Sequence, residues 1–116
     1  MRCTEPDRVS SDSNQGFQAL ANFAGSPIAD VLPVDMLTSD DRVESPQGAD
    51  CAVVAANHEI AAAWPAGAPM LLGYNKVTSK PDATVVATVD DDVLIATREV
   101  GAGRSLVWTS DIGPHW

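Results

Sequence analysis

The sequence predicts an α/β fold whose C-terminal half is a meander of short β-strands. Apolar runs rich in Val, Ile and Thr recur in the second half and are separated by Gly, Pro and Asp clusters, a pattern typical of strands joined by turns. The N-terminal half combines short helical patterns with a long acidic segment. With 116 residues, 45% of them hydrophobic, the chain has the size and composition of one globular domain.

The N-terminal half is expected to consist of short helices and loops. The apolar spacing in 16–23 predicts a short helix. Ser26 followed by Pro27 predicts a capped helical turn that runs to about Val31 and stops at Pro33. Residues 35–50 are rich in acids and turn formers, and we expect a long surface loop there that includes a short edge strand.

The C-terminal half is expected to alternate strands with tight turns. The run at 51–56 predicts a strand, and 57–64 a short helix that is capped by Asn57 and ends before Pro65. Further strands are predicted at 69–77, 84–89, 93–100 and 104–110, with turns at "KPDA" (80–83), "DDD" (90–92) and "GAG" (101–103).

The charge balance narrows the classes of partner. There are 16 acidic and 7 basic side chains, a formal net charge of −9, which argues against nucleic acid or an anionic membrane as the main partner. No apolar run is long enough to span a bilayer, and the first twenty residues lack a signal-peptide core, so we expect a cytoplasmic protein. Cys3 and Cys51 lack zinc spacing and are expected to be free thiols; no metal or cofactor is expected.

Several short motifs favour a structural interpretation over a functional one. The "GAGR" run lacks the third Gly of a dinucleotide fingerprint and is followed by a strand, so a hairpin turn is favoured. The acidic runs 90–92 and 40–41 lack the spaced ligands of a Ca²⁺ loop and are interpreted as solvated turns. His58 precedes a short helix, where a surface or capping role is favoured over catalysis.

Polar residues follow two apolar strands and form the candidate site. Tyr74 and Asn75 end "LLGYN", either where a strand leaves the core or at a strand edge where α/β folds bind ligands. Asp111 and His115 follow "RSLVWTS", and such a pair can fix an imidazole tautomer for acid–base chemistry. The alternative is a local turn capped by Asp111. We expect all four at one rim if their strands run parallel, and at opposite rims if antiparallel.

The chain resembles a bacterial family called putative glutamine amidotransferases. The resemblance rests on "ANFAGSPIADVLPV", "DDRVESPQG", "LLGYN", "KPDATVVATV" and, most specifically, "TSDIGPHW", and covers about residues 13–116. It implies a class I glutamine amidotransferase-like (flavodoxin-like) domain with a C-terminal β-meander. It also implies that this chain is a fragment, with 1–12 an unmatched and disordered start and 13–116 an incomplete domain. An unpaired, apolar sheet edge would make such a fragment marginally stable.

The resemblance also bears on activity. A working glutaminase of this fold needs a nucleophilic Cys on a strand–turn–helix elbow, and no G-x-C-x-G is present. We therefore expect no glutamine hydrolysis by this chain. By position His115 resembles the late His of class I enzymes, although their His-Pro-Glu sequence is replaced here by Pro114-His115-Trp116. Asp111 and His115 are the catalytic candidates, and Tyr74 and Asn75 would bind an unknown small molecule. The alternative is a non-catalytic ligand-binding or subunit-interaction module, and the intact parent is expected to form homo-oligomers.

Overall fold

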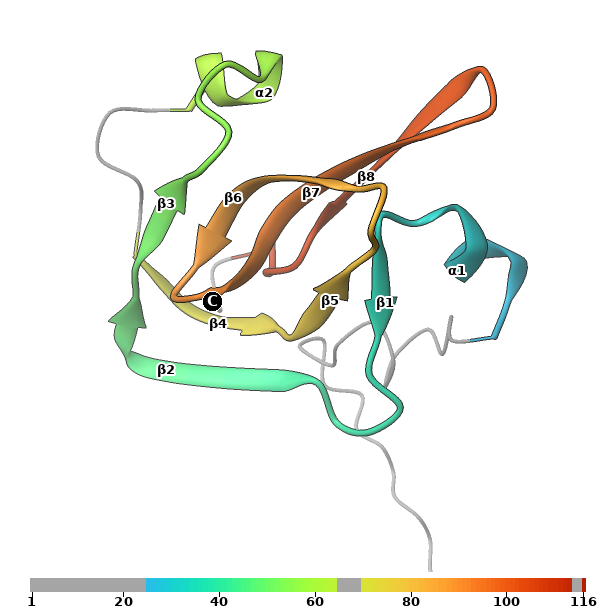
Figure 1. Ribbon diagram of the computed structural model, residues 1–116. Helices are drawn as coiled ribbons and strands as arrows, with labels where there is room; N and C mark the ends of the chain where they lie inside the picture. Colours follow the sequence, from blue (N-terminus) through green and yellow to red (C-terminus); the bar gives the residue numbers. More distant parts are fainter. Residues whose placement is uncertain (1–24, 65–69, 114–115) are drawn as a thin grey trace, which may run out of the picture.

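The computed structural model describes residues 25–64, 70–113 and 116, in which strands dominate (Figure 1). The elements are α1 (Pro27–Val31), β1 (Val34–Met36), β2 (Arg42–Ala49), β3 (Cys51–Val53), α2 (Glu59–Ala62), β4 (Leu71–Asn75), β5 (Val77–Ser79), β6 (Thr84–Val89), β7 (Asp92–Val100) and β8 (Gly103–Trp108). The helix expected at 16–23 and the start expected at 1–12 lie outside the described residues.

The strands form three antiparallel groups. The largest is a four-stranded sheet in the order β3-β6-β7-β8, and the others are the pairs β2-β4 and β1-β5. Consecutive pairing of β6, β7 and β8 confirms the predicted meander over these three strands, whereas β4 and β5 pair with β2 and β1 outside it. Every strand pair among the described residues is antiparallel, so the predicted α/β class is confirmed only as a sheet-rich mixture of strands and short helices.

Two-residue loops create the meander, as the turn signals predicted. Val89 pairs with Asp92 across the first loop, where Asp90 has a φ of 52°. Val100 pairs with Gly103 across the second, where Gly101 has a φ of 59°. Tight hairpins need left-handed residues because their twist must match that of the strands, and Gly and Asp tolerate this conformation best.

The core lies on both faces of β7, the strand in the middle of the meander. Leu94 packs in a cluster with Val86 and Val89 of β6, while Ala96 packs in a second cluster with Val34 of β1. A strand that is covered on both sides carries a continuous apolar run instead of an alternating one, as Val93–Ala96 does.

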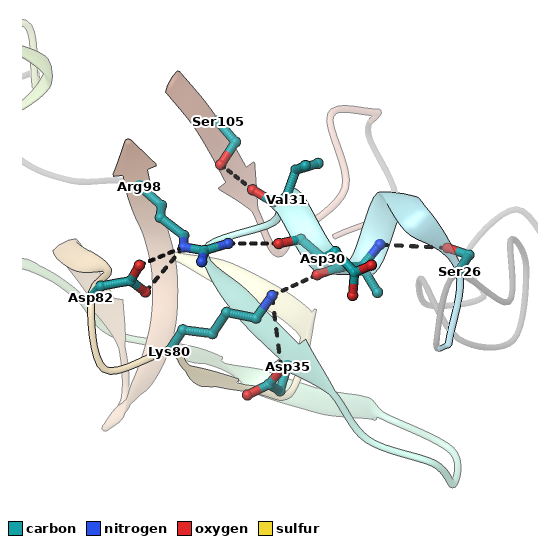
Figure 2. A network of polar contacts seen from close by, with 9 residues as sticks. Ser26, Asp30, Val31, Asp35, Lys80, Asp82, Arg98 and Ser105 are labelled. Atoms are coloured by element: carbon teal, nitrogen blue, oxygen red, sulfur yellow. Dashed lines mark hydrogen bonds and ion pairs between the residues drawn. The ribbon is translucent and has the colours of Figure 1, made fainter. Parts of the chain in front are cut away.

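Side chains from the β5–β6 turn, β7 and β8 donate hydrogen bonds to the C-terminal carbonyls of α1 (Figure 2). Lys80 Nζ donates to Ala29 O at 2.6 Å, Arg98 donates to Asp30 O at 2.6 Å, and Ser105 Oγ donates to Val31 O at 2.5 Å. Basic groups are favourable at a helix C-terminus, where the last carbonyls lack partners within the helix. The predicted helix is confirmed, with Ser26 as its N-cap.

Three element predictions need correction. Residues 35–50 are more than a loop with a short edge strand, because β1 and the eight-residue β2 occupy much of the segment. β2 lacks a clear apolar period, because most of its half-buried and exposed positions alike are polar. The strand expected at 69–77 is split at Lys76 into β4 and β5, which pair with different partners. The N-cap of α2 is His58, whose ring accepts from Ile60 N–H, and not Asn57.

Candidate functional site

The end of β4 meets the end of β8 through a backbone hydrogen bond. Asn75 N–H donates to Thr109 O at 2.7 Å, and at the other end of β4 Leu72 N–H donates to Trp116 O at 2.9 Å. We call residues 109–116, described at 109–113 and 116, the closing segment. Because Asn75 bonds the first residue of this segment and Leu72 bonds the last, the segment runs antiparallel to β4 and begins at the end of β4. β4 and β8 belong to different sheets, whereas both predicted alternatives placed them in one sheet.

Thr109 anchors this junction in the meander. Its N–H donates to Leu94 O at 3.1 Å and its hydroxyl donates to Val93 O at 2.8 Å. The side chain is fully buried. Since a buried hydroxyl is costly without a partner, these bonds fix Thr109 between β7 and β4.

Asn75 is buried beside a carboxylate. Its Nδ2 donates to Asp41 Oδ1 at 3.3 Å, and Lys76 N–H donates to Asp41 O at 2.6 Å. Only 1% of Asp41 is exposed, so the prediction of a solvated turn at 40–41 is wrong for this residue. It holds for Asp40, where hydrogen bonds from Arg42 lower the carboxyl pKa to about 2.

Tyr74 is buried and serves as a donor. Its hydroxyl donates to Asp92 Oδ2 at 2.8 Å, and Lys76 Nζ lies 3.5 Å from the other oxygen of that carboxylate. Burial, followed by the hydrogen bond to Asp92, raises the pKa of the Tyr74 hydroxyl. Tyr74 therefore remains protonated at neutral pH. The prediction of a solvated turn at 90–92 is wrong for Asp92, which is the half-buried first residue of β7.

Asp111 forms a local turn just beyond the junction. Its Oδ1 accepts from Gly113 N–H at 2.6 Å, and its carbonyl accepts from Trp108 Nε1 at 3.5 Å. This is the capped turn named as the alternative in the sequence prediction. His115 lies outside the described residues, so the predicted Asp–His pair stays a prediction.

Gly73 and Trp116 complete the site, and neither was singled out from the sequence. Trp116 is 8% exposed and its Nε1 lies 3.4 Å from Glu44 Oε2, to which it donates. A Cβ at Gly73 would overlap the indole, 2.5 Å from Nε1. A Gly inside the predicted strand "LLGYN" was the available signal, because such a Gly often marks a close approach.

The family model described as "Putative glutamine amidotransferase" matches residues 11–116. The chain belongs to this family. No curated protein matches the chain.

Two solved structures are similar to this member of the family. Cytoplasmic Protein STM3548 from Salmonella typhimurium is 39% identical with a TM-score of 0.80, over 87% of this chain and 41% of that one. Cytoplasmic Protein STM1381 from Salmonella typhimurium LT2 is 40% identical with a TM-score of 0.78, over 85% of this chain and 40% of that one. The chain therefore spans about two fifths of the length of each relative.

The cysteine that the structure describes is poorly suited to the nucleophilic role that the family name suggests. Cys51 is half-buried at the start of β3. Burial, followed by the charges of Asp90 and Asp50, raises the pKa of its thiol. A nucleophilic thiol needs the opposite environment, one that stabilises the thiolate.

His58 has the capping role predicted for it. Its Nδ1 accepts from Ile60 N–H at 3.2 Å, which places the ring proton on Nε2, 3.3 Å from Thr97 Oγ1. It also lines a hollow of about 220 Å³ together with Arg104 and Leu106. None of the residues at the β4–β8 junction lines this hollow.

The described residues contain neither a cluster of metal ligands nor a membrane-spanning helix. Within 25–64, 70–113 and 116, no three His, Cys, Asp or Glu side chains gather as a metal site would require. In the same part of the chain, no helix is long and apolar enough to cross a membrane.

Proposed function

We propose that the described part of the chain forms a ligand-binding rim of a glutamine amidotransferase-like domain and supplies no nucleophile for glutamine hydrolysis. The hydrogen bond from Asn75 N–H to Thr109 O carries the proposal, because it joins the polar ends of two strands. Ligands of α/β folds bind where strand ends meet. The class I, flavodoxin-like character of the whole protein and a cytoplasmic location belong to the same proposal, supported by the family match and the Salmonella relatives.

The chemistry of the rim favours a ligand that donates hydrogen bonds. Asp111 is a half-buried carboxylate on the closing segment, and a second carboxylate, Asp92, already engages Tyr74. Carboxylates accept hydrogen bonds and repel anions. A small molecule with an amino or primary amide group fits this setting, and L-glutamine carries both.

Tyr74 and Asn75 contribute to this rim mainly as supports. They are 3% and 7% exposed, and their polar atoms are engaged by Asp92, Asp41 and Thr109. Asp111 is more accessible and is the residue that we propose contacts the ligand. We further propose that Asp111 orients the imidazole of His115 for acid–base catalysis, as carboxylates do for imidazoles in other enzymes.

A titration of the 116-residue chain with L-glutamine, followed by amide NMR shifts, tests the proposal. Saturable shifts at Asn75 and at 109–113 are expected. Asp111→Asn keeps the acceptor for Gly113 but removes the charge, and should weaken binding by about three- to tenfold, since a hydrogen bond to a charged group contributes roughly 1.5–3 kcal/mol and a neutral one less. Asp91→Asn removes the same charge at an exposed turn and serves as the control. Shifts confined to other segments, or equal effects of both variants, would contradict the proposal.

A further inference from the structure

The closing segment is tied to β4 at two points with unequal lengths of chain between them. The backbone bonds join Asn75 to Thr109 and Leu72 to Trp116. Between these positions β4 has only residues 73–74, whereas the closing segment has residues 110–115. Within the described part of this longer stretch, Ile112 is 95% exposed, so the chain points away from β4 at that residue.

The first anchor inside this interval is a side chain. Ser110 Oγ donates to Gly73 O at 2.8 Å. The bond lies directly beside Asp111 in the chain, so it constrains the backbone from which the Asp111 side chain projects. The turn that follows, from Asp111 Oδ1 to Gly113 N–H, starts from this fixed point.

The second anchor is the indole of Trp116, which lies against the same residue of β4. The absence of a side chain at Gly73 makes room for the ring, and Glu44 of β2 accepts from its Nε1. Gly73 therefore contacts both Ser110 and Trp116: the hydroxyl of Ser110 donates to its carbonyl, and the indole of Trp116 packs over its Cα.

We propose that Ser110 and Trp116 are positioning residues that dock on Gly73 and fix the direction in which Asp111 faces a ligand. The inference rests on the proposed function, since it gives Asp111 a ligand to face. Neither residue needs to touch that ligand. With Ser110 and Trp116 docked on β4, less ordering of Asp111 is required when the ligand binds.

Hydrogen exchange at the Gly113 amide tests the positioning without any ligand. This amide donates to Asp111 Oδ1, so its protection reports the orientation of that carboxylate. Ser110→Ala in the 116-residue chain should speed exchange at Gly113 by about three- to tenfold, the range expected for one lost neutral hydrogen bond. Ser105→Ala removes a hydroxyl-to-carbonyl bond of the same kind, to Val31 O, and should leave Gly113 unchanged.

A second variant and a binding measurement complete the test. Trp116→Phe keeps an aromatic ring on Gly73 but removes the bond to Glu44, and should speed Gly113 exchange less than Ser110→Ala does. Faster exchange together with weaker L-glutamine binding supports the positioning role. Unchanged exchange in both variants overturns it, as does faster exchange with unchanged L-glutamine affinity. Failure of the unsubstituted chain to bind L-glutamine counts against the proposed function. Gly113 exchange still decides whether Ser110 and Trp116 fix the Asp111 turn.

Discussion

Gly73 shows how a single residue determines the packing of the site. Its missing side chain leaves the space that the Trp116 indole fills, and the ring in turn covers the middle of β4. Little free volume remains around the indole, because protein interiors are packed as densely as organic crystals. The contact joins two segments that are far apart in the sequence.

Gly73→Ala is therefore expected to destabilise the fold. The new Cβ would overlap the indole, and overpacking typically costs about 1–3 kcal/mol. Urea denaturation measures the loss. Gly103→Ala is the matched control, because the nearest atom to a Cβ there, Val100 O, is 3.7 Å away. Equal stability of the two variants would show that Trp116 moves aside without cost.

Cys51 gives a prediction about pH. The raised pKa of its thiol means that less thiolate is present at neutral pH than in an ordinary cysteine. In a Cys3→Ala background, alkylation by iodoacetamide at pH 7.5 should be several-fold slower than alkylation of free cysteine, and should accelerate as the pH rises towards the raised pKa. Asp90→Asn removes a charge that raises this pKa and should speed the reaction. A reaction as fast as that of free cysteine would contradict the assignment.

Single residues were predictable where the cause is local. Ser26 as a cap, His58 as a capping partner and Asp90 in a turn all follow from their immediate neighbours. The burial of Asp41 does not, because it depends on Asn75, 34 positions away. The packing of Trp116 against Gly73 was likewise not predictable, because the two residues are 43 positions apart in the sequence.

At the scale of elements, α1 depends on its surroundings. A helix of five residues is far too short to be stable alone in water. Three side chains from the β5–β6 turn, β7 and β8 engage its last carbonyls (Figure 2). The start of α1 was readable from Ser26 and Pro27, whereas these carbonyl contacts required the folded sheet.

Arg98→Gln should loosen α1. Arg98 joins Asp30 O to the Asp82 carboxylate, and its loss should cost about 1–2 kcal/mol, because hydrogen bonds from charged donors are the stronger ones. Arg104→Gln is the control: Arg104 is paired with Glu59 at an exposed site, where such pairs contribute under about 1 kcal/mol. Urea denaturation gives the stability, and amide exchange in α1 gives the local effect. A larger loss for Arg104→Gln would overturn the assignment.

The predictability of strands also differed between elements. The meander was predicted closely because its strands are β-branched and its turns carry Gly and Asp. β2 was missed, since its residues are mostly polar and it is stabilised by pairing with β4. The split between β4 and β5 was missed for a related reason: the apolar pattern continues across Lys76, while the partner strand changes.

At the scale of the whole molecule, the described residues leave apolar side chains on the surface. Met70, Leu72 and Ile112 are 59%, 44% and 95% exposed. The 116-residue chain is therefore expected to be marginally stable and prone to associate when purified alone. Size-exclusion chromatography and thermal melting check this. A monomer that melts in a single cooperative transition would contradict it.

The most direct test of the central claim is an assay of ammonia release from L-glutamine by the 116-residue chain. The account predicts no release above a buffer blank, because the raised pKa of the Cys51 thiol leaves little thiolate at neutral pH and no other cysteine lies in 25–64, 70–113 and 116. The Cys51→Ala variant should behave identically. Ammonia release that disappears in Cys51→Ala would show that this cysteine is a working nucleophile and would contradict the account.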